Sequence, residues 1–387
     1  MIRIQDKKDC CGCTACASIC PHAAITMEPD ALGFLYPKVN EAKCIECGLC
    51  EKVCAFHKGY NRYDNYEEPF VYGCRHKEIN ELVSSQSGAL ATAIMEKFLE
   101  KPGVVYGVAY DKDLNVVHKR VTSLYECGEF KGSKYVQSDL TGIFQCVFKD
   151  LRNGANVLFF GTPCQIAGLK SFIPGRYHDG LLLVDNICHA VPSPALWRSY
   201  REWVERKYHK KVVKTNFRNK EFGWHSHIET FTFDDNSSVS RESFKNLFYN
   251  HLIVRPSCST CYFTNLKRVA DITIGDFWGW EKTHSKWNDN KGVSLALINT
   301  PIGERFFNSL DDYIDRETAS IEECMQPQLI KPIEIDERKL RDVEKRFARR
   351  GYYSVAFKYG DVGFHHVINR TVYKIYKSTC QKIGLRK

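Results

Sequence analysis

From residue 70 onward, short apolar stretches of strand length alternate with segments of helical periodicity. Residues 104–110 have the length and β-branched content of a strand, and the continuous apolar run 156–161 predicts a strand buried on both faces. The apolar residues of 89–100 and 139–152 recur at helical spacing. A strand over 181–187 and a helix over 194–207 continue the pattern. This alternation predicts a mixed α/β domain with functional residues at the carboxyl ends of its strands.

The pattern changes in the second half of the chain. Residues 212–217 and 228–233 have strand character, and the turn sequence 234–236 that follows predicts β-hairpins. A further strand is predicted over 270–274. From residue 330 on, the chain is basic and helical in pattern, and it carries no functional signal.

Cysteine is concentrated at the N-terminus, where nine of the 18 cysteines lie within the first 54 residues. They form two runs of one spacing, Cys10-x2-Cys13-x2-Cys16-x3-Cys20-Pro21 and Cys44-x2-Cys47-x2-Cys50-x3-Cys54. In bacterial ferredoxins with two clusters, the last cysteine of each such run crosses to the other cluster. This arrangement assigns one 4Fe-4S cluster to Cys10, Cys13, Cys16 and Cys54, and its twin to Cys44, Cys47, Cys50 and Cys20.

Zinc is the alternative, because paired Cys-x2-Cys motifs also build zinc sites with four thiolate ligands. Two complete runs with the bacterial spacing, one of them followed by its proline, favour clusters. The second run has Ala55 where the first has Pro21. The first run also contains the additional Cys11, which we interpret as a spare thiol. Neither departure changes the predicted ligands.

The polar, tyrosine-bearing segment 58–69 has no periodicity and predicts a domain boundary. We therefore expect an α+β protein in which a small two-cluster ferredoxin-like domain precedes a mixed α/β domain with a hairpin-rich C-terminal part. The predicted domains are 1–60, 70–190 and 191–387.

Charge and composition limit the compartment and the partners. No apolar run precedes Cys10, and none elsewhere reaches the length of a transmembrane helix, so we expect a cytoplasmic protein with no membrane span and reduced cysteines. Clusters of this kind are lost in air, which points to an anaerobe. The net charge of +9 is spread along the chain, and its densest segment, 338–350, is interleaved with acids. We expect an acidic electron carrier such as ferredoxin as the partner, and no nucleic acid.

Four later cysteines stand where ligands are expected. Cys164 and Cys188 follow predicted strands, and Cys258 and Cys261 form another Cys-x2-Cys pair. The alternative is that they are small buried hydrophobic residues. That alternative suits the remaining five, which lie inside ordinary elements or in the tail: Cys74, Cys127, Cys146, Cys324 and Cys380.

Several short motifs accompany these cysteines in a fixed order. They are Ser87-Gly88 before a helix, Gly132-Ser133-Lys134-Tyr135, Gly161-Thr162-Pro163-Cys164-Gln165, Cys188-His189, Cys258-x2-Cys261, and Asp271 with Gly275-Asp276-Phe277-Trp278. Together with the cysteine runs, this set resembles the beta subunit of coenzyme F420 hydrogenase and dehydrogenase and related iron-sulfur flavoproteins. The resemblance covers residues 1 to about 300.

The resemblance implies FAD in the α/β domain and one further 4Fe-4S cluster, on Cys164, Cys188, Cys258 and Cys261. Relatives exchange electrons between clusters and a deazaflavin or another reducible molecule. A flavin suits such a chain, because clusters carry single electrons and a flavin exchanges one or two. Ala89 and Ala190 stand where relatives often have glycine, which leaves the ligands unchanged.

The residues expected to contact the flavin are Ser87, Gly88, Ser133, Lys134, Tyr135 and Asp276. Backbone N–H groups of Ser87 and Gly88 at a helix N-terminus would hold a pyrophosphate, and Lys134 would add charge. The alternatives are a helix cap at Ser87 and a solvated lysine at residue 134. His189 is either a proton donor or ligand-orienting group, or a structural histidine.

The sequence therefore predicts an oxidoreductase of unknown substrate that moves electrons between its clusters and a small-molecule two-electron acceptor through FAD. The alternative is a non-catalytic electron-transfer subunit that links a partner oxidoreductase to a ferredoxin-like carrier. The sequence contains no DNA-binding motif that would support a third function, a cluster-bearing regulator.

Overall fold

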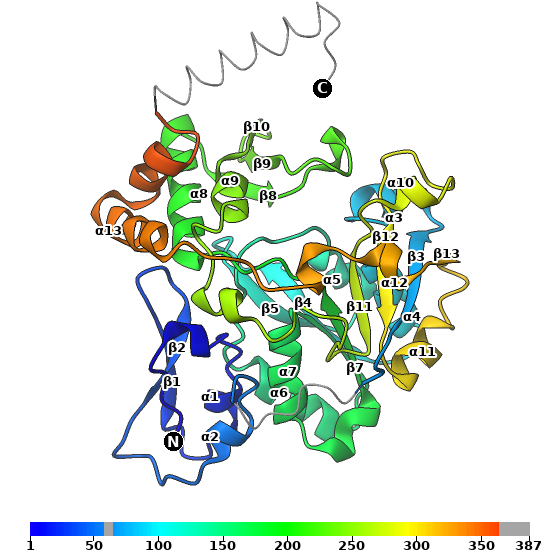
Figure 1. The fold of residues 1–387 in the computed structure, drawn as a ribbon, viewed down its shortest axis with the longest axis horizontal. Helices are drawn as coiled ribbons and strands as arrows, with labels where there is room; N and C mark the ends of the chain where they lie inside the picture. Colours follow the sequence, from blue (N-terminus) through cyan, green and yellow to red (C-terminus); the bar gives the residue numbers. More distant parts are fainter. Residues whose placement is uncertain (58–64, 364–387) are drawn as a thin grey trace, which may run out of the picture.

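A small N-terminal module lies along one side of a larger α/β body (Figure 1). The structure is a computed structural model that describes residues 1–57 and 65–363. The start of the predicted boundary segment and the last 24 residues, with Cys380, lie outside this part. No helix among the described residues is long and apolar enough to cross a membrane.

The N-terminal module repeats its backbone conformation as it repeats its cysteines. Thr14 and Gly48, related by the 34-residue offset, both have left-handed backbone (φ 68° and 73°) and each begins a short helix. Gly12 and Glu46 form a second such pair (φ 72° and 55°). The module contains η1 (Lys7–Asp9), α1 (Ala15–Ile19), the antiparallel strands β1 (Ile25–Pro29) and β2 (Leu35–Val39), and α2 (Leu49–Lys52).

The body is built on one mixed sheet of eight strands in the order β13-β3-β12-β11-β7-β6-β4-β5. Its four central strands β4, β6, β7 and β11 are parallel, and the outer pairings are antiparallel. The bounds are β3 (Phe70–His76), β4 (Val104–Tyr110), β5 (Val116–Val121), β6 (Val157–Gly161), β7 (Leu181–Asn186), β11 (Ile272–Asp276), β12 (Ser294–Ile298) and β13 (Ile314–Thr318).

The sheet runs through the domain boundary predicted at residue 190, which is a correction to the sequence analysis. β7, before that residue, pairs in parallel with β11, after it. The eight strands of this sheet therefore come from both sides of residue 190, because β3 to β7 precede that residue and β11 to β13 follow it.

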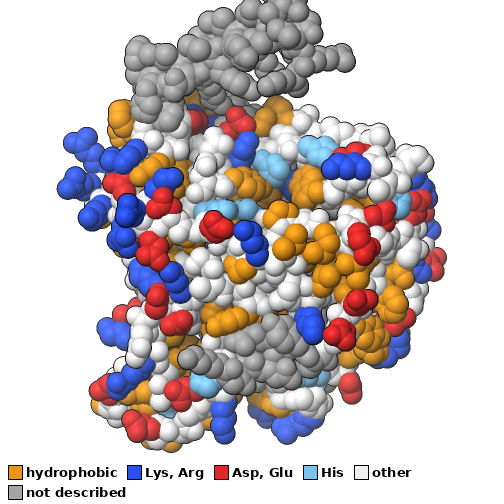
Figure 2. Space-filling view, in the orientation of Figure 1, with side chains coloured by type: hydrophobic (Ala, Val, Ile, Leu, Met, Phe, Trp, Pro, Cys, Tyr) orange, Lys and Arg blue, Asp and Glu red, His pale blue; other side chains and the backbone are white. Residues whose placement is uncertain are grey.

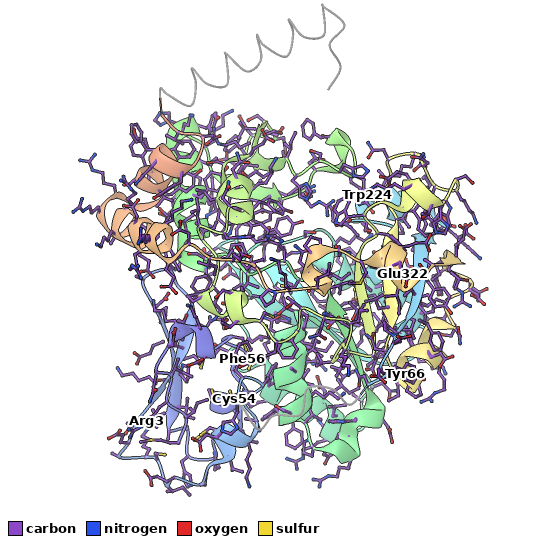
Figure 3. The ribbon with its side chains drawn as sticks, viewed as in Figure 1. Arg3, Cys54, Phe56, Tyr66, Trp224 and Glu322 are labelled. Carbon is purple, nitrogen blue, oxygen red and sulfur yellow. The ribbon has the colours of Figure 1, made fainter. Side chains whose placement is uncertain are left out.

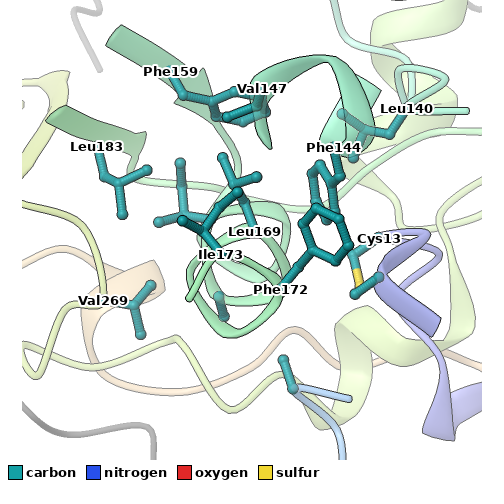
Figure 4. Close-up of a cluster of buried hydrophobic side chains, with 14 of the residues drawn as sticks. Cys13, Leu140, Phe144, Val147, Phe159, Leu169, Phe172, Ile173, Leu183 and Val269 are labelled. Carbon is teal, nitrogen blue, oxygen red and sulfur yellow. The ribbon is translucent and has the colours of Figure 1, made fainter. Parts of the chain in front are cut away.

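Helices cover both faces of this sheet. On β6, Val157 and Phe159 point to one core and Leu158 points to the other, as the continuous apolar run predicts. Figure 4 shows the first core, where Phe144 packs against both Phe159 and Phe172. The helices of the body's sheet are α3 (Ile79–Ser84), α4 (Leu90–Phe98), α5 (Leu124–Cys127), α6 (Ile143–Arg152), α7 (Pro163–Phe172), α10 (Trp280–Thr283), α11 (Pro301–Phe307) and α12 (Ile321–Cys324).

A second, three-stranded sheet confirms the predicted hairpins. Its antiparallel strands are β8 (Val212–Asn216), β9 (Glu229–Phe233) and β10 (Ser238–Arg241). It packs with α8 (Pro194–Tyr208), α9 (Ser243–Tyr249) and the basic helix α13 (Glu337–Tyr359), which is kinked at Arg350 and Gly351. The 3-10 segments are η2 (Gly128–Phe130), η3 (Gly175–Gly180), η4 (Lys220–Phe222), η5 (Pro256–Thr260) and η6 (Pro327–Leu329).

Polar contacts fix the module against the body. The Ser193 hydroxyl and the Ala195 N–H both donate to the Leu32 carbonyl (2.5 and 3.1 Å). The Ser171 hydroxyl donates to the Val53 carbonyl at 2.6 Å. Because these bonds join backbone carbonyls of the module to the starts and ends of body helices, the cysteine runs have a defined position relative to the sheet.

Candidate electron-transfer site

The outermost cysteine set lies near the tip of the module. Cys20, Cys44, Cys47 and Cys50 line one cavity that encloses about 380 Å³. Backbone N–H groups of Ile2 and Ala24 donate to the sulfurs of Cys50 and Cys20, each at 3.3 Å. Cys47 is exposed, and 62% of Ile45 is exposed beside it. We call these four cysteines the distal set.

The first three cysteines of the first run lie with Cys54 from the second run. Burial, together with the nearby thiols of Cys13, Cys10 and Cys54, raises the pKa of Cys16. Burial and the neighbouring Cys13 and Cys10 raise the pKa of Cys54 to about 11. The last cysteine of each run thus lies with the other run's first three. We call Cys10, Cys13, Cys16 and Cys54 the inner set.

A third set of cysteines meets inside the body. Cys164 lies in the first turn of α7 and Cys188 follows β7, while Cys258 and Cys261 lie on and just after η5. All four line one cavity of about 480 Å³. Burial and the other thiols raise the pKa of Cys188, and those of Cys258 and Cys261 to about 12. We call these four the body set.

Cys11, interpreted from the sequence as a spare thiol, has a specific position. It is buried, lines the cavity of the body set, and hydrogen-bonds to the thiols of both Cys13 and Cys164. Its hydrogen bond to Cys164 is the main cause of the lowered pKa of that thiol. Cys11 therefore connects the inner set to the body set. Its extra position within the first run was the only sequence signal for this role.

The other cysteines are separate from these sets. Cys74, Cys127 and Cys324 are buried in hydrophobic clusters and Cys146 is exposed. Every cysteine within residues 1–57 and 65–363 is a free thiol. In the same residues, no three or more His, Cys, Asp or Glu side chains are grouped to hold a single metal ion.

Arg255, which the sequence analysis did not select, lies between the inner and body sets. It is 0% exposed and lines the cavity of the body set. Its guanidinium donates to the Cys10 carbonyl (2.7 Å) and the Gln137 amide oxygen (2.9 Å), and contacts the Cys10 sulfur at 3.6 Å. The sequence before the Cys258-x2-Cys261 pair has no pattern that would predict a buried arginine between two cysteine sets.

Ser87 and Gly88 do not present free donors at a helix N-terminus. The Ser87 hydroxyl donates to the Val293 carbonyl at 2.7 Å. The N–H of Gly88 donates to the Ser294 hydroxyl at 2.9 Å, and so does that of Leu90 at 3.4 Å. Ser294 of β12 thus satisfies the Gly88 N–H, one of the two that were expected to hold a pyrophosphate, and Ser87 is not the helix cap either, because residue 89 occupies that position.

Lys134 is not a solvated surface lysine. Its ammonium donates to the carbonyls of Phe130, Lys131 and Gly132 at 3.1 to 3.3 Å, and burial lowers its pKa to about 7. Ser133 beside it is half-buried. Tyr135 points away from this loop, packs on Phe248 and interacts with Arg218.

Asp276, at the carboxyl end of β11, anchors a cluster of basic and aromatic side chains. Its carboxylate accepts hydrogen bonds from Arg218 (2.5 Å) and from the indole of Trp224 (2.6 Å). Trp224 stacks on Trp278, and the Arg218 guanidinium lies 5.3 Å from the centre of the Trp278 ring. Figure 3 labels Trp224 in the upper part of the body, on the side away from the N-terminal module. We call these residues the Asp276 cluster.

Lys220 of η4 links this cluster to Ser87. Its ammonium donates to the carbonyls of Ser87 and Leu82 at 2.8 and 2.7 Å, and burial lowers its pKa to about 8. Tyr135, Asp276 and the carbonyl of Ser87 thus lie around Arg218 and Lys220. Neither cation had a sequence signal, because both follow the predicted hairpin strand in an irregular segment.

His189 joins a chain of polar side chains. Its two ring nitrogens contact His251 at 3.0 Å and the Gln328 amide at 2.7 Å. Burial, with smaller effects of His251 and His227, lowers its pKa to about 4. Both nitrogens therefore have protein partners. Figure 2 shows histidine side chains gathered among hydrophobic ones in the upper half of this face.

Positive charge is unevenly placed. The described module, residues 1–57, has six Lys or Arg and seven Asp or Glu, whereas α13 has eight basic and three acidic residues. Figure 2 shows Lys and Arg side chains along the edge occupied by α13. The excess positive charge therefore lies outside the module that carries the exposed cysteines. This differs from the expectation that the charge would draw an acidic carrier to that module.

Two segments of the chain match protein-family models. Residues 154–323 match the family model that describes the C terminus of the coenzyme F420 hydrogenase/dehydrogenase beta subunit. Residues 9–58 match the 4Fe-4S dicluster domain. The second match covers both cysteine runs, and the first covers all four cysteines of the body set.

Three individual proteins are similar to this chain over different shares of its length. One subunit of the F(420)H(2) dehydrogenase of Methanosarcina mazei is 19% identical over 79% of this chain and 83% of its own length. A polyferredoxin-like protein of Methanocaldococcus jannaschii is 37% identical over 13% of the chain and 36% of its own length. A chain of the F420-reducing [NiFe] hydrogenase complex from Methanosarcina barkeri aligns over 73% of this chain and 93% of its own, with 18% identity and a TM-score of 0.47.

Proposed function

We propose that this chain, which resembles coenzyme F420 hydrogenase/dehydrogenase beta subunits over residues 154–323 and matches the 4Fe-4S dicluster domain over residues 9–58, is a three-cluster flavoprotein oxidoreductase. In this proposal, 4Fe-4S clusters on the distal, inner and body sets pass single electrons to FAD, which exchanges electron pairs with a small-molecule acceptor.

One observation carries the proposal: the three cysteine sets are consecutive neighbours. Cys16 and Cys50, which belong to the inner and distal sets, share one small core with Cys20 and Cys54. Cys11 then contacts both Cys13 of the inner set and Cys164 of the body set. A line of adjacent thiol-lined sites suits electron transfer from the module's exposed tip into the body.

The donor chemistry of the body set fits a third 4Fe-4S cluster. Its four ligands are all thiols, which as thiolates are the soft donors that iron-sulfur clusters use. They come from a strand end, a helix start and a Cys-x2-Cys turn, and all face one cavity. When bound, the cluster would supply one-electron chemistry inside the body.

The Asp276 cluster supports a flavin site in the body. Arg218 and Lys220 supply positive charge for phosphate groups, and Trp224 and Trp278 supply ring faces for stacking. The buried Nε of Arg218 has no hydrogen-bond partner among the described residues. We propose that Asp276 orients Arg218 toward FAD, that Tyr135 lies against the same site, and that Ser133 and Lys134 contribute from the neighbouring loop.

The acceptor and the partner follow from the same reasoning. A deazaflavin-like molecule, or another small two-electron acceptor, would meet the flavin. The relatives are named as parts of a dehydrogenase and of a hydrogenase complex, which supports a partner oxidoreductase subunit. A ferredoxin-like carrier at the distal set is the alternative source of single electrons, and relative potentials fix the direction of flow.

Anaerobic reconstitution tests the assignment. The full chain should take up about twelve irons, and Cys188→Ala about eight, because one cluster loses a ligand. Cys127→Ala is the matched control, a buried cysteine outside the three sets, and should keep about twelve. Uptake of about eight irons by the unchanged chain would remove the third cluster from the proposal.

Retention of flavin distinguishes a flavoprotein enzyme from a non-catalytic electron-transfer subunit. Supplied with FAD, the enzyme should retain it through gel filtration and reduce a small acceptor. A chain that holds its clusters, retains no FAD and purifies only with a second subunit would instead be a non-catalytic electron-transfer subunit.

A further inference from the structure

Arg255 is a buried cation without a carboxylate partner. Its side chain is 0% exposed, and no Asp or Glu among the described residues forms an ion pair with it. Its hydrogen bonds go to uncharged oxygens, namely the carbonyls of Cys10 (2.7 Å) and Leu35 (2.9 Å) and the amide of Gln137 (2.9 Å). Burial of an arginine is unfavourable unless an opposite charge lies near.

Three other buried arginines of this chain each have the carboxylate partner that Arg255 lacks among the described residues. Arg75 pairs with Asp289 at 2.6 Å, Arg218 with Asp276 at 2.5 Å, and Arg268 with Asp185 at 2.9 Å. Each of these charges is compensated by a carboxylate of the protein. Arg255 therefore differs from residues of equal burial, and its compensating charge must come from another group.

The described groups beside the guanidinium that can carry negative charge are the sulfurs of Cys10, Cys11 and Cys258 and the hydroxyl of Tyr36. One guanidinium nitrogen lies 3.6 Å from the Cys10 sulfur of the inner set, and the side chain also lines the cavity of the body set with Cys258. The backbone of Gly12 allows this approach, since an added Cβ would lie 2.7 Å from the other terminal nitrogen. The Tyr36 ring covers the guanidinium carbon at 4.3 Å.

We propose that Arg255 is an electrostatic coupling residue whose charge is compensated by the two clusters that flank it. A 4Fe-4S cluster gains one negative charge when it accepts one electron, so a buried cation beside it stabilises the reduced form. Arg255 thereby raises the reduction potentials of the inner and body clusters relative to that of the distal cluster. The guanidinium stays protonated throughout, so the electron moves without a proton.

Among the described residues, no buried arginine or lysine side chain lines the cavity of the distal set. The basic groups of its cavity wall are the N-terminal ammonium of Met1, which pairs with Glu51 at 3.7 Å, and the exposed side chains of His22 and Lys43. A carboxylate compensates the first of these, and water and salt screen the other two. Arg255 thus favours transfer of an electron from the outer cluster to the inner pair. The inference about the inner cluster stands on the dicluster domain alone, and its extension to the body cluster rests on the proposed function.

Redox titration of the reconstituted full chain tests this role. Arg255→Gln removes the charge, and Arg255→Lys keeps it. With dithionite as the one-electron donor and EPR detection, Arg255→Gln should lower the equilibrium constant for reduction of the inner cluster at least tenfold, or ~59 mV. Arg255→Lys should stay within about threefold of the unchanged chain. Arg3→Gln is the control with the same charge change at an exposed, ion-paired position, and should leave every potential in place.

The titration distinguishes an effect of Arg255 on the inner and body clusters from an effect on all three clusters. Titration of a Cys47→Ala variant, which lacks the distal cluster, identifies the potential that belongs to that cluster. Unchanged potentials in Arg255→Gln, or an equal shift of the distal cluster, would overturn the proposal. If Arg255→Gln fails to hold iron, Arg255→Lys decides: retention at the original potential supports the charge, and equal loss refutes it. Uptake of only eight irons by the unchanged chain would refute the body cluster while the inner cluster still reports on Arg255.

Discussion

The sulfur of Cys13 lies directly against the backbone of Gly168 in α7. A Cβ added at residue 168 would lie 2.6 Å from that sulfur, closer than atoms pack. Figure 4 shows Cys13 among the aromatic residues of the body's core, beside Phe144 and Phe172. The inner set is thus joined to the body by direct packing of a predicted ligand.

This contact predicts the effect of Gly168→Ala. The added methyl group must displace Cys13 or α7, so we expect a loss of about 1–3 kcal/mol in unfolding free energy and a lower content of the inner cluster. Urea unfolding and iron analysis under anaerobic conditions measure the two effects. Gly175→Ala is the control, because nothing lies within 4 Å of its added Cβ. Equal behaviour of the two variants would show that the contact is not constraining.

The crossed arrangement of the module predicts a pattern of paired substitutions. Cys10→Ala and Cys54→Ala should each remove about four irons, and the double variant should also remove about four, because both residues hold one cluster. Cys54→Ala combined with Cys47→Ala should remove about eight. Iron and acid-labile sulfide analysis after reconstitution gives the count. If Cys54 instead behaved additively with Cys10 and not with Cys47, the ligands would not cross.

Substitution of Asp276 should lower both the affinity for FAD and the free energy of unfolding. Asp276→Asn keeps an acceptor for Trp224 but removes the charge that compensates Arg218, so we expect a loss of about 3–5 kcal/mol in unfolding free energy. FAD affinity should fall about tenfold, as followed by quenching of flavin fluorescence. The exposed substitution Asp311→Asn is the control. Unchanged FAD affinity in a folded Asp276→Asn variant would place the flavin elsewhere.

Glu229 predicts a pH dependence of stability. Burial raises the pKa of its carboxyl to about 7 from an ordinary value of 4.5. Between these pH values the folded chain binds more protons than the unfolded chain, so the unfolding free energy should decrease as pH rises from about 4.5 to 7. The loss attributable to Glu229 is roughly 3 kcal/mol.

Glu229→Gln should remove this slope and be the more stable protein above pH 7. Urea unfolding of the anaerobic protein at pH 5, 6, 7 and 8 measures it. Glu202→Gln, an exposed position on α8, should retain the original profile. Parallel profiles for all three proteins would mean that Glu229 is not the titrating group.

The charge on α13 predicts how an acidic carrier would approach. The N-terminal part of α13 packs on the module through Leu340 and through the ion pair of Lys8 with Glu337 at 2.5 Å. We expect Lys345→Glu combined with Arg349→Glu to slow anaerobic stopped-flow reduction by an acidic ferredoxin at low salt, and the difference to vanish at high salt. Lys207→Glu on α8, outside this helix, is the control. Equal rates at low salt would mean that α13 does not attract the carrier.

The sequence by itself determined the features that depend on short stretches of chain. Cluster ligands three residues apart must face one metal centre, so the spacing of Cys10 to Cys54 predicted the dicluster domain without any fold. The apolar run of β6 and the hairpin of β8 and β9 likewise follow from local periodicity. Each signal lies within a few residues, where chain geometry leaves few alternatives.

Only the tertiary structure decided which distant groups meet. The sheet joins residues across the boundary expected at 190 because β7 pairs with β11. The donors of Gly88 are satisfied by Ser294, about 200 residues away in sequence. Arg218, Lys220 and Arg255 lie in irregular segments whose side chains have no periodic pattern, so their positions depend on long-range packing. For the same reason the sequence identified Cys11 only as a spare thiol, whereas the fold shows that it lies between Cys13 and Cys164.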